Sequence, residues 1–318
     1  MSYSQGGLIQ ATDYNNFIGA NPAIGSGTIN AVWSTGSGAW GYGQTALSQS
    51  ASSAGLVTAT QWSTMVNTLN SILIHQSGSG SGITAPTSGT TINYLSTLAT
   101  NIGTAYTNAR TFASNAAVTT GSALASTWTN ATTSSTLSRA FGARAAFASA
   151  DQARYFFNAG GRLKFNISGA QSSSTTARTN AVIALCTDLG GVSLFAANTN
   201  GGRTGTGGTL GTNATSVGYY TATYNANVTM VSITSTTSSY TSDNASITVN
   251  TNGTQGSNND RGLYVDFWAT LNSSSGSNAG GLSFDDSIGV SVTRSIDISY
   301  PETTNLSITW GTITVSLL

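Results

Sequence analysis

Charged residues are scarce in this sequence. Its 318 residues include 10 Lys and Arg and 10 Asp and Glu, so charged side chains make up 6% of the chain and the formal net charge is zero. An ordinary soluble domain carries roughly 25% charged residues. The chain therefore lacks the basic surface of a nucleic-acid binder, and it lacks a basic face for an anionic membrane. So few charges favour association, and we expect the chain to work assembled with other chains.

Cysteine, histidine and proline are also rare, at one, one and three residues. The single cysteine, Cys186, excludes an internal disulfide, and one cysteine with one histidine, His75, does not make a zinc site. Three prolines without a Gly-X-Y period exclude collagen. No apolar run reaches the roughly 18–20 residues that span a bilayer, and the first residues lack the pattern of a secretion signal. We therefore expect neither membrane insertion nor a secretion signal.

The few titratable residues do not form a catalytic pattern. His75 would need a nucleophile and an orienting carboxylate, and neither stands at a readable spacing. A glycosidase needs two facing carboxylates, but Asp285 and Asp286 are adjacent and would point to opposite faces of a strand, which leaves Asp266 alone. The sequence thus predicts that the protein is not an enzyme, with no catalytic, cofactor-binding or metal site.

Several loops have residues that could contact a ligand. The oxygen-rich loops 251–260 and 272–286 leave calcium as an alternative, although they lack EF-hand spacing. The glycine run at 200–211 lacks the Lys-Ser/Thr of a phosphate loop, and we expect a flexible hairpin loop there. Aromatic residues such as Tyr219 and Tyr240 suit either sugar stacking or packing in a core, and we favour packing.

The first part of the chain is helical in pattern and contains a short internal repeat. Residues 8–18, LIQATDYNNFI, match residues 56–66, LVTATQWSTMV. In the second copy, Thr58 and Gln61 form a capping-box pair, and Val57 is placed to pack on the first helical turn. The repeat predicts two helices that pack on each other or on a neighbouring chain.

Large aromatic and apolar residues cluster around this repeat. Tyr14 and Trp62 occupy equivalent places in the two copies, and an aromatic, glycine-rich loop lies between the copies. Such residues suit a buried seam or a contact between chains. The residues that we predict for an assembly interface are Tyr14, Phe17, Trp33, Trp40, Trp62 and Met65.

We assign residues 1–160 to a mainly helical region for attachment and oligomerisation. Residues 77–90, SGSGSGITAPTSGT, read as a linker or turn within it. Helical spacing resumes at residues 92–106, and Ser149 with Gln152 starts a further short helix.

Residues 161–318 form a β-rich domain in this reading. Apolar residues alternate with polar ones at 163–168, 263–271 and 288–298, and again around 306–317 with a one-residue slip at Gly311 that is typical of a β-bulge. One helix is expected near 176–189. The predicted fold class is α+β, with a helical N-terminal half followed by an antiparallel, sandwich-like C-terminal half.

Five stretches of the sequence resemble virion structural proteins of tailed bacteriophages, including tail-fibre and baseplate-associated proteins of cyanophage-like viruses. The stretches are IQATDYNNF with INAVWSTGSGAWGYGQT and VTATQWSTMVNTL near the start, ARYFFNAGGRLKFNISGA at 153–170, and ISYPETTNLSITWGTITV near the end. The resemblance implies a building block of the virion and carries over no catalytic residues.

The function that we expect is a structural component of a phage virion, a tail fibre or a fibre-anchoring protein that serves assembly or host attachment. A neck or capsid decoration protein and a carbohydrate-binding adhesin are the alternatives. The expected partners are further copies of the chain, as a trimer, other virion tail proteins and a host surface glycan. The expected location is the virion, assembled in the cytoplasm of a bacterial host, with no nucleic-acid partner.

Overall fold

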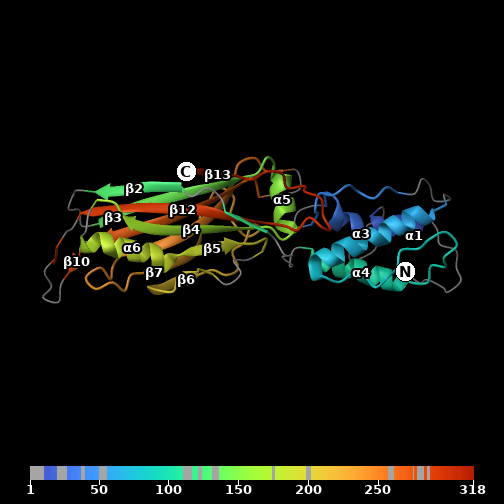
Figure 1. The fold of residues 1–318 in the computed structure, drawn as a ribbon, viewed down its shortest axis with the longest axis horizontal. Helices are drawn as coiled ribbons and strands as arrows, with labels where there is room; N and C mark the ends of the chain where they lie inside the picture. Colours follow the sequence, from blue (N-terminus) through green and yellow to red (C-terminus); the bar gives the residue numbers. More distant parts are fainter. Residues whose placement is uncertain are drawn as a thin grey trace.

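The protein is elongated, with a helical unit at one end and a β unit at the other (Figure 1). The computed structural model describes residues 11–19, 27–36, 40–49, 56–109, 117–120, 124–130, 136–173, 176–197, 202–256, 261–274, 276–277, 283–284 and 287–318. The described residues between 11 and 109 make up the helical unit, and the two main sheets with helix α6 (Ala177–Leu189) make up the β unit. Helix α5 (Ala150–Asn158) lies across the long axis between them (Figure 1). The predicted α+β class is confirmed.

The described residues of the helical unit form four helices: α1 (Ala11–Ile18), α2 (Ile29–Trp33), α3 (Ala59–Ser77) and α4 (Leu95–Asn108). The capping box predicted for α3 is present, because the Thr58 hydroxyl accepts from the Gln61 amide and the Gln61 side chain accepts from the Thr58 amide. Helix α3 ends at Gly78, whose positive φ of 77° closes the last turn without a steric penalty.

Helices α3 and α4 run in the same direction. Gln76, near the end of α3, donates to the carbonyl of Ala105, near the end of α4, at 2.8 Å. The segment between the helices therefore returns along the unit, and Asn101 of α4 holds it by donating to the carbonyl of Ser81. The predicted linker at 77–90 is thus the first part of this return and stays inside the helical unit.

The β unit is built from two antiparallel sheets. One has the order β1-β12-β4-β5, with β2 also paired to β12, and the other has the order β13-β3-β9-β8-β7-β6. A short β10–β11 pair stands apart. The strands are β1 (Ala117–Thr120), β2 (Leu124–Asn130), β3 (Thr136–Ala146), β4 (Arg162–Gln171), β5 (Gly191–Leu194), β6 (Thr209–Asn213), β7 (Val228–Thr234), β8 (Asn244–Asn252), β9 (Tyr264–Ser274), β10 (Gly276–Ser277), β11 (Ser283–Phe284), β12 (Ile288–Tyr300) and β13 (Thr314–Leu317).

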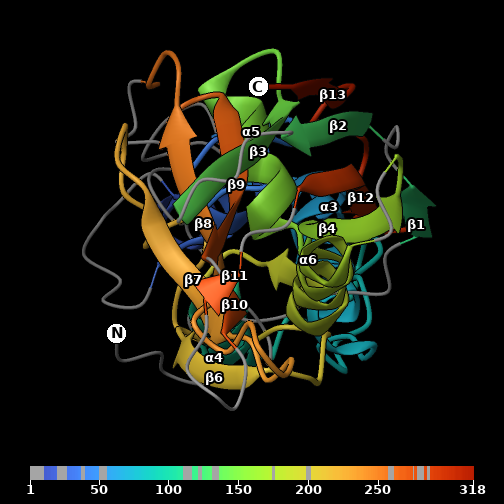
Figure 2. The same cartoon turned by 90° about the vertical axis from the view of Figure 1, so that its left-hand side faces the viewer.

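The two sheets face each other over an apolar core (Figure 2). Phe165 of β4 stacks on Phe267 of β9 with ring centroids 5.4 Å apart, so the inner faces meet directly there. Helix α6 packs on β4 and β12 of one sheet and on β7, β8 and β9 of the other. It lies along one side of the sandwich (Figure 2), and its buried residues include Val182, Leu185 and Cys186.

The border between the two units lies earlier than we predicted. Strands β1, β2 and β3 begin the β unit at residue 117, well before residue 160. The segments of β1 and β2 show no apolar period, since AVTT and LASTWTN are rich in Ser, Thr and Ala. Their pairing with β12, rather than a local pattern, makes them strands.

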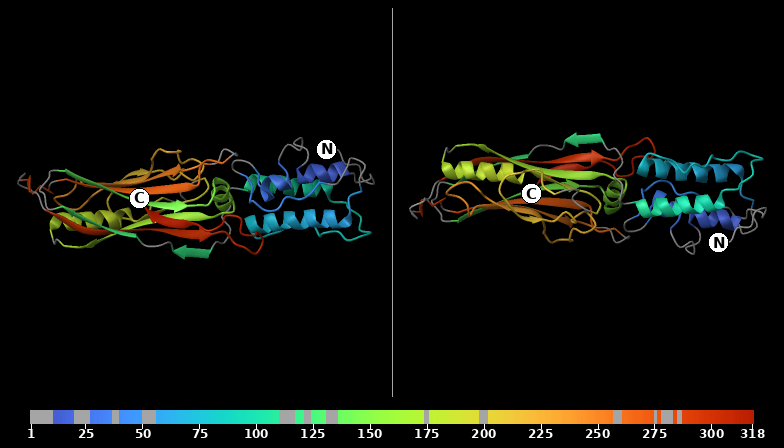
Figure 3. Two further views of the ribbon diagram at one scale, coloured as in Figure 1. Left: turned by 90° about the horizontal axis from the view of Figure 1, so that it is seen from above. Right: turned by 90° about the horizontal axis from the view of Figure 1, so that it is seen from below.

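The prediction of a strand over residues 306–317 was wrong for residues 306–313. Only Thr314–Leu317 form a strand, β13, whereas residues 301–313 have no regular structure. Leu306 and Trp310 are nevertheless buried, because this segment runs back to the helical unit before it rejoins the β unit. Figure 3 shows this return beside the end of the helical unit. Among the helices that the structure describes, none has the length and apolar character to cross a membrane.

Candidate assembly site

Four of the six residues predicted for an assembly interface lie in the core of one chain. Tyr14 and Phe17 come from α1, and Trp62 and Met65 come from α3. The ring of Trp62 lies 5.9 Å from that of Tyr14 and 6.3 Å from that of Phe17, measured between centroids. The repeat therefore builds a seam between two helices of the same chain, and its side chains are not at the surface.

Trp33 and Trp40, the other two predicted residues, are half-buried and hydrogen-bonded. The indole of Trp33 donates to the carbonyl of Thr45 at 3.0 Å. The indole of Trp40 donates to the carbonyl of Tyr106 at 3.1 Å and stacks on the Tyr106 ring with centroids 4.8 Å apart. These contacts fasten the aromatic segment to α2 and α4.

Helix α5 clamps the helical unit to the β unit. Arg154, fully buried, donates from Nη1 to the carbonyls of Thr35 and Trp40 at 2.6 and 2.5 Å and from Nη2 to Asp151 at 2.9 Å. Asn158 donates to the carbonyl of Gly41 at 3.0 Å. Gly41 has a φ of +101°, and a Cβ there would lie 2.3 Å from the Thr35 carbonyl oxygen, so only glycine fits this approach.

The C-terminal segment makes a second set of contacts with the same part of the helical unit. Gln44 and Ser307 exchange two hydrogen bonds, at 2.8 and 3.0 Å, and the hydroxyl of Thr309 donates to the carbonyl of Tyr42 at 2.6 Å. We call residues 35–36 and 40–44, α5 and residues 302–309 together the joint. Backbone carbonyls and buried amides dominate it, so the two units are held by directional bonds as well as by apolar packing.

His75 lies at the joint and pairs with Glu302. Its Nδ1 is 2.8 Å from Glu302 Oε1, and its ring meets that of Tyr42 edge-on with centroids 5.3 Å apart. Burial lowers the pKa of His75, whereas Glu302 and the Ala159 carbonyl raise it. The effect of burial is the larger, so the pKa lies below its ordinary value and the ring is neutral at pH 7.

The pKa of Glu302 also lies below its ordinary value. Burial raises this pKa, but hydrogen bonds from His75 and from residues 304–305 outweigh that effect. An ionised carboxylate only accepts hydrogen bonds, so His75 carries its proton on Nδ1 and donates it to Glu302. The sequence offered no signal for a partner of His75 so far along the chain.

The acidic, thiol and tyrosine side chains that could serve catalysis or sugar binding are instead paired or buried within the fold. Asp266 is buried and accepts two hydrogen bonds of 2.7 Å from Arg144. Burial raises the pKa of the Cys186 thiol to about 12. Tyr219 and Tyr240 are buried, which fits packing in the core.

Other weighed residues lie outside the described part of the chain. Asp285 and Asp286 are among them, as are residues 257–260 of one loop considered for calcium. Within the residues that the structure describes, no group of three or more His, Cys, Asp or Glu side chains is placed to hold a metal ion.

The glycine-rich loop is attached to α6 over its described residues. Arg203 donates to the carbonyl of Asp188, and Gly191 and Thr204 bond each other through a backbone bond of 2.7 Å and a hydroxyl bond of 2.8 Å. Residues 209–213 then form β6. We expected a flexible hairpin loop, but residues 202–205 are hydrogen-bonded to the C-terminal end of α6 and to the residue that starts β5.

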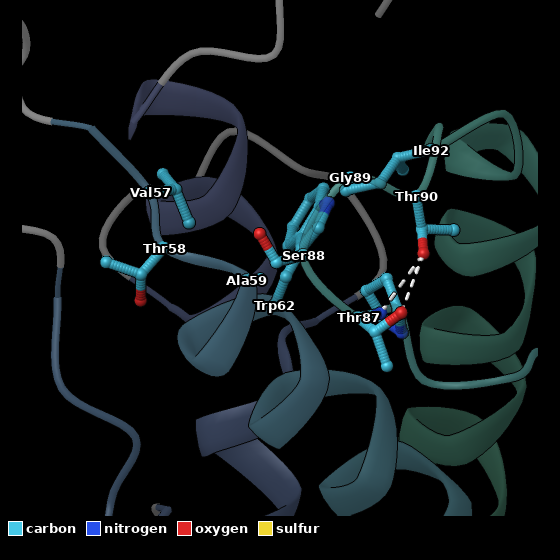
Figure 4. Close-up of a pocket in the computed structure, with 10 residues that line it drawn as sticks. Val57, Thr58, Ala59, Trp62, Thr87, Ser88, Gly89, Thr90 and Ile92 are labelled. Atoms are coloured by element: carbon cyan, nitrogen blue, oxygen red, sulfur yellow. Dashed lines mark hydrogen bonds between the residues drawn. The ribbon is translucent and has the colours of Figure 1, made fainter.

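The free end of the helical unit carries a pocket of about 290 Å³. It lies between the first turn of α3 and the segment before α4 (Figure 4). Leu56, which precedes the lining residue Val57, is 92% exposed.

Comparisons with models of protein families, with curated proteins and with solved structures find nothing that matches this chain.

Proposed function

We propose that this protein is a structural component of a phage virion, a tail fibre or a fibre-anchoring protein, and that its helical unit attaches to the particle or to sister chains. The observation that carries the proposal is the joint, because a protein that links two parts of an assembly must hold its two ends in a fixed arrangement. Arg154, Asn158 and the Gln44–Ser307 pair couple the two units of an elongated molecule. The resemblance to virion proteins supports the same conclusion.

The surface of the helical unit supports an attachment role. Asp13 is the one charged residue that precedes Arg110 in the sequence. On α4, the exposed hydroxyls of Thr100, Thr104 and Thr107 each donate to the carbonyl four residues earlier. Their hydroxyl donors are satisfied within the helix, so contact of this face with another protein does not leave these O–H groups unpaired.

Labelling of particles with an antibody against the chain tests the location. Label along the tail supports the proposed function, whereas label at the neck or on the capsid supports the alternative of a decoration protein. Absence of the chain from purified particles would overturn both.

Two matched surface variants test which unit attaches. Thr104→Glu places a charge on the exposed face of α4, and Thr212→Glu places one on the exposed edge strand β6. We expect Thr104→Glu to block incorporation into particles and Thr212→Glu to leave it intact, with both variants melting like the unmodified protein. The opposite pattern would assign attachment to the β unit.

A further inference from the structure

The pocket at the free end of the helical unit contains a hydrogen-bond donor without an acceptor. Trp62 is 2% exposed, and its Nε1 has no hydrogen-bond partner among the residues that the structure describes. Helical side chains tilt toward the N-terminus, so the indole of Trp62 lies beside the first turn of α3. Figure 4 shows its nitrogen on the side of Gly89 and Ile92. A buried N–H without an acceptor destabilises a fold, and its presence here points to a partner that the described part of the chain does not supply.

The first turn of α3 adds further donors to the same pocket. The capping box uses the amides of Thr58 and Gln61. The amides of Ala59 and Thr60 bond no other described residue, and Ala59 lines the pocket. Helix α3 is 19 residues long, so its N-terminus carries the partial positive charge of a full helix dipole. Donors from two independent sources therefore converge on one cavity.

The remaining lining defines what else the ligand must have. Val57, Pro86 and Ile92 provide an apolar wall, and Ser88 provides a hydroxyl. Lys, Arg, His, Asp and Glu are absent from the lining residues that the structure describes. A phosphate dianion would lack a counter-cation here, whereas a single carboxylate suits neutral donors and a helix dipole.

We propose that this pocket binds the carboxylate of a small ligand whose body is apolar or is a sugar ring. One carboxylate oxygen accepts from Nε1 of Trp62, the other faces the amides that begin α3, and the body of the ligand packs on Val57 and Ile92. The turn 87–90 closes over the indole. Its bonds run between Thr87 and Thr90, so it can shift without breaking a bond to α3.

Titration of the ¹⁵N-labelled full chain tests the proposal through its indole N–H signals. Trp62→Phe, which keeps an aromatic ring in the seam, assigns the Trp62 signal by its loss. With isovalerate as the probe, we expect a saturable shift of the Trp62 signal while the other five indole signals stay in place. Isovaleramide, which has the same shape without the charge, and inorganic phosphate should each bind at least about tenfold more weakly, a difference of ~1.4 kcal/mol.

Two further measurements identify the kind of carboxylate that binds and test whether binding occurs in the pocket rather than elsewhere on the surface. Glucuronate that binds more tightly than isovalerate identifies an acidic sugar, and the reverse order identifies a small organic acid. Ser88→Leu, on the exposed turn, should abolish the shift, whereas Thr97→Leu on the exposed face of α4 should not. No saturable shift of the Trp62 signal with either carboxylate, or equal binding of isovaleramide, would overturn the proposal.

Discussion

Nδ1 of His75 donates a hydrogen bond of 2.8 Å to Oε1 of Glu302, and the two residues are 227 positions apart in the sequence. These are the only histidine and the only glutamate of the chain. The His75 side chain is almost fully buried and Glu302 is mostly so, and the pair lies where the C-terminal segment returns to the helical unit. In a protein with so few charges, this pair is placed at the joint between the two units.

Removal of the Glu302 carboxylate should weaken the joint. In Glu302→Ala, the buried Nδ1–H of His75 and the amides of Thr304 and Asn305 lose their acceptor. We expect a loss of about 2–3 kcal/mol in the free energy of unfolding, measured with urea. Glu302→Gln keeps an acceptor oxygen and should lose less. Equal stability of both variants and the unmodified protein would show that the pair does not hold the joint.

Acidification should destabilise the protein in two steps through this pair. His75 has a pKa in the folded protein below its ordinary value of 6.5, so the unfolded chain binds the proton first and stability falls as the pH drops below about 6.5. The pKa of Glu302 is also lowered, so a further loss begins below about 4.5. Melting temperatures between pH 7.5 and 4 measure both steps. In His75→Gln the first step should be absent, and a first step of unchanged size in that variant would contradict the assignment.

Trp62→Ala should destabilise the helical unit strongly, because it leaves a cavity between α1 and α3. The expected loss is ~3–5 kcal/mol in the free energy of unfolding. Leu56→Ala, at a position that is 92% exposed, serves as the control and should change stability by no more than about 0.5 kcal/mol. Similar losses in the two variants would mean that the seam does not carry the stability of this unit.

Arg154→Met should loosen the loop that α5 clamps. The variant leaves the carbonyls of Thr35 and Trp40 without their charged donor, and we expect a loss of about 3 kcal/mol. The amides of Tyr42, Gly43 and Gln44, which bond residues 32–34, should exchange their hydrogens faster. Arg144→Met, which removes the ion pair with Asp266 inside the β unit, is the matched control and should leave exchange at residues 42–44 unchanged.

Local interactions made several parts of this fold predictable. The capping box at Thr58, the start of α5 at Ser149 and the alternation of Leu163, Phe165 and Ile167 depend on neighbours within a few residues. The Tyr14–Trp62 contact was also predictable as a seam, because the repeat placed an aromatic residue at the same point of two amphipathic helices. Whether that seam lay within a chain or between chains was left open by the repeat.

The sequence by itself determined the α+β class, the capped starts of α3 and α5, the alternation in β4, β9 and β12 and the neutral, charge-poor character of the chain, since each follows from composition or from short-range spacing. The tertiary structure alone decided that β1 and β2 pair with β12, that residues 301–313 return to the helical unit, and that His75 meets Glu302. The physical reason is the range of the interactions. A polar residue without a periodic pattern is compatible with many partners, and only the packed chain brings one of them within hydrogen-bond distance.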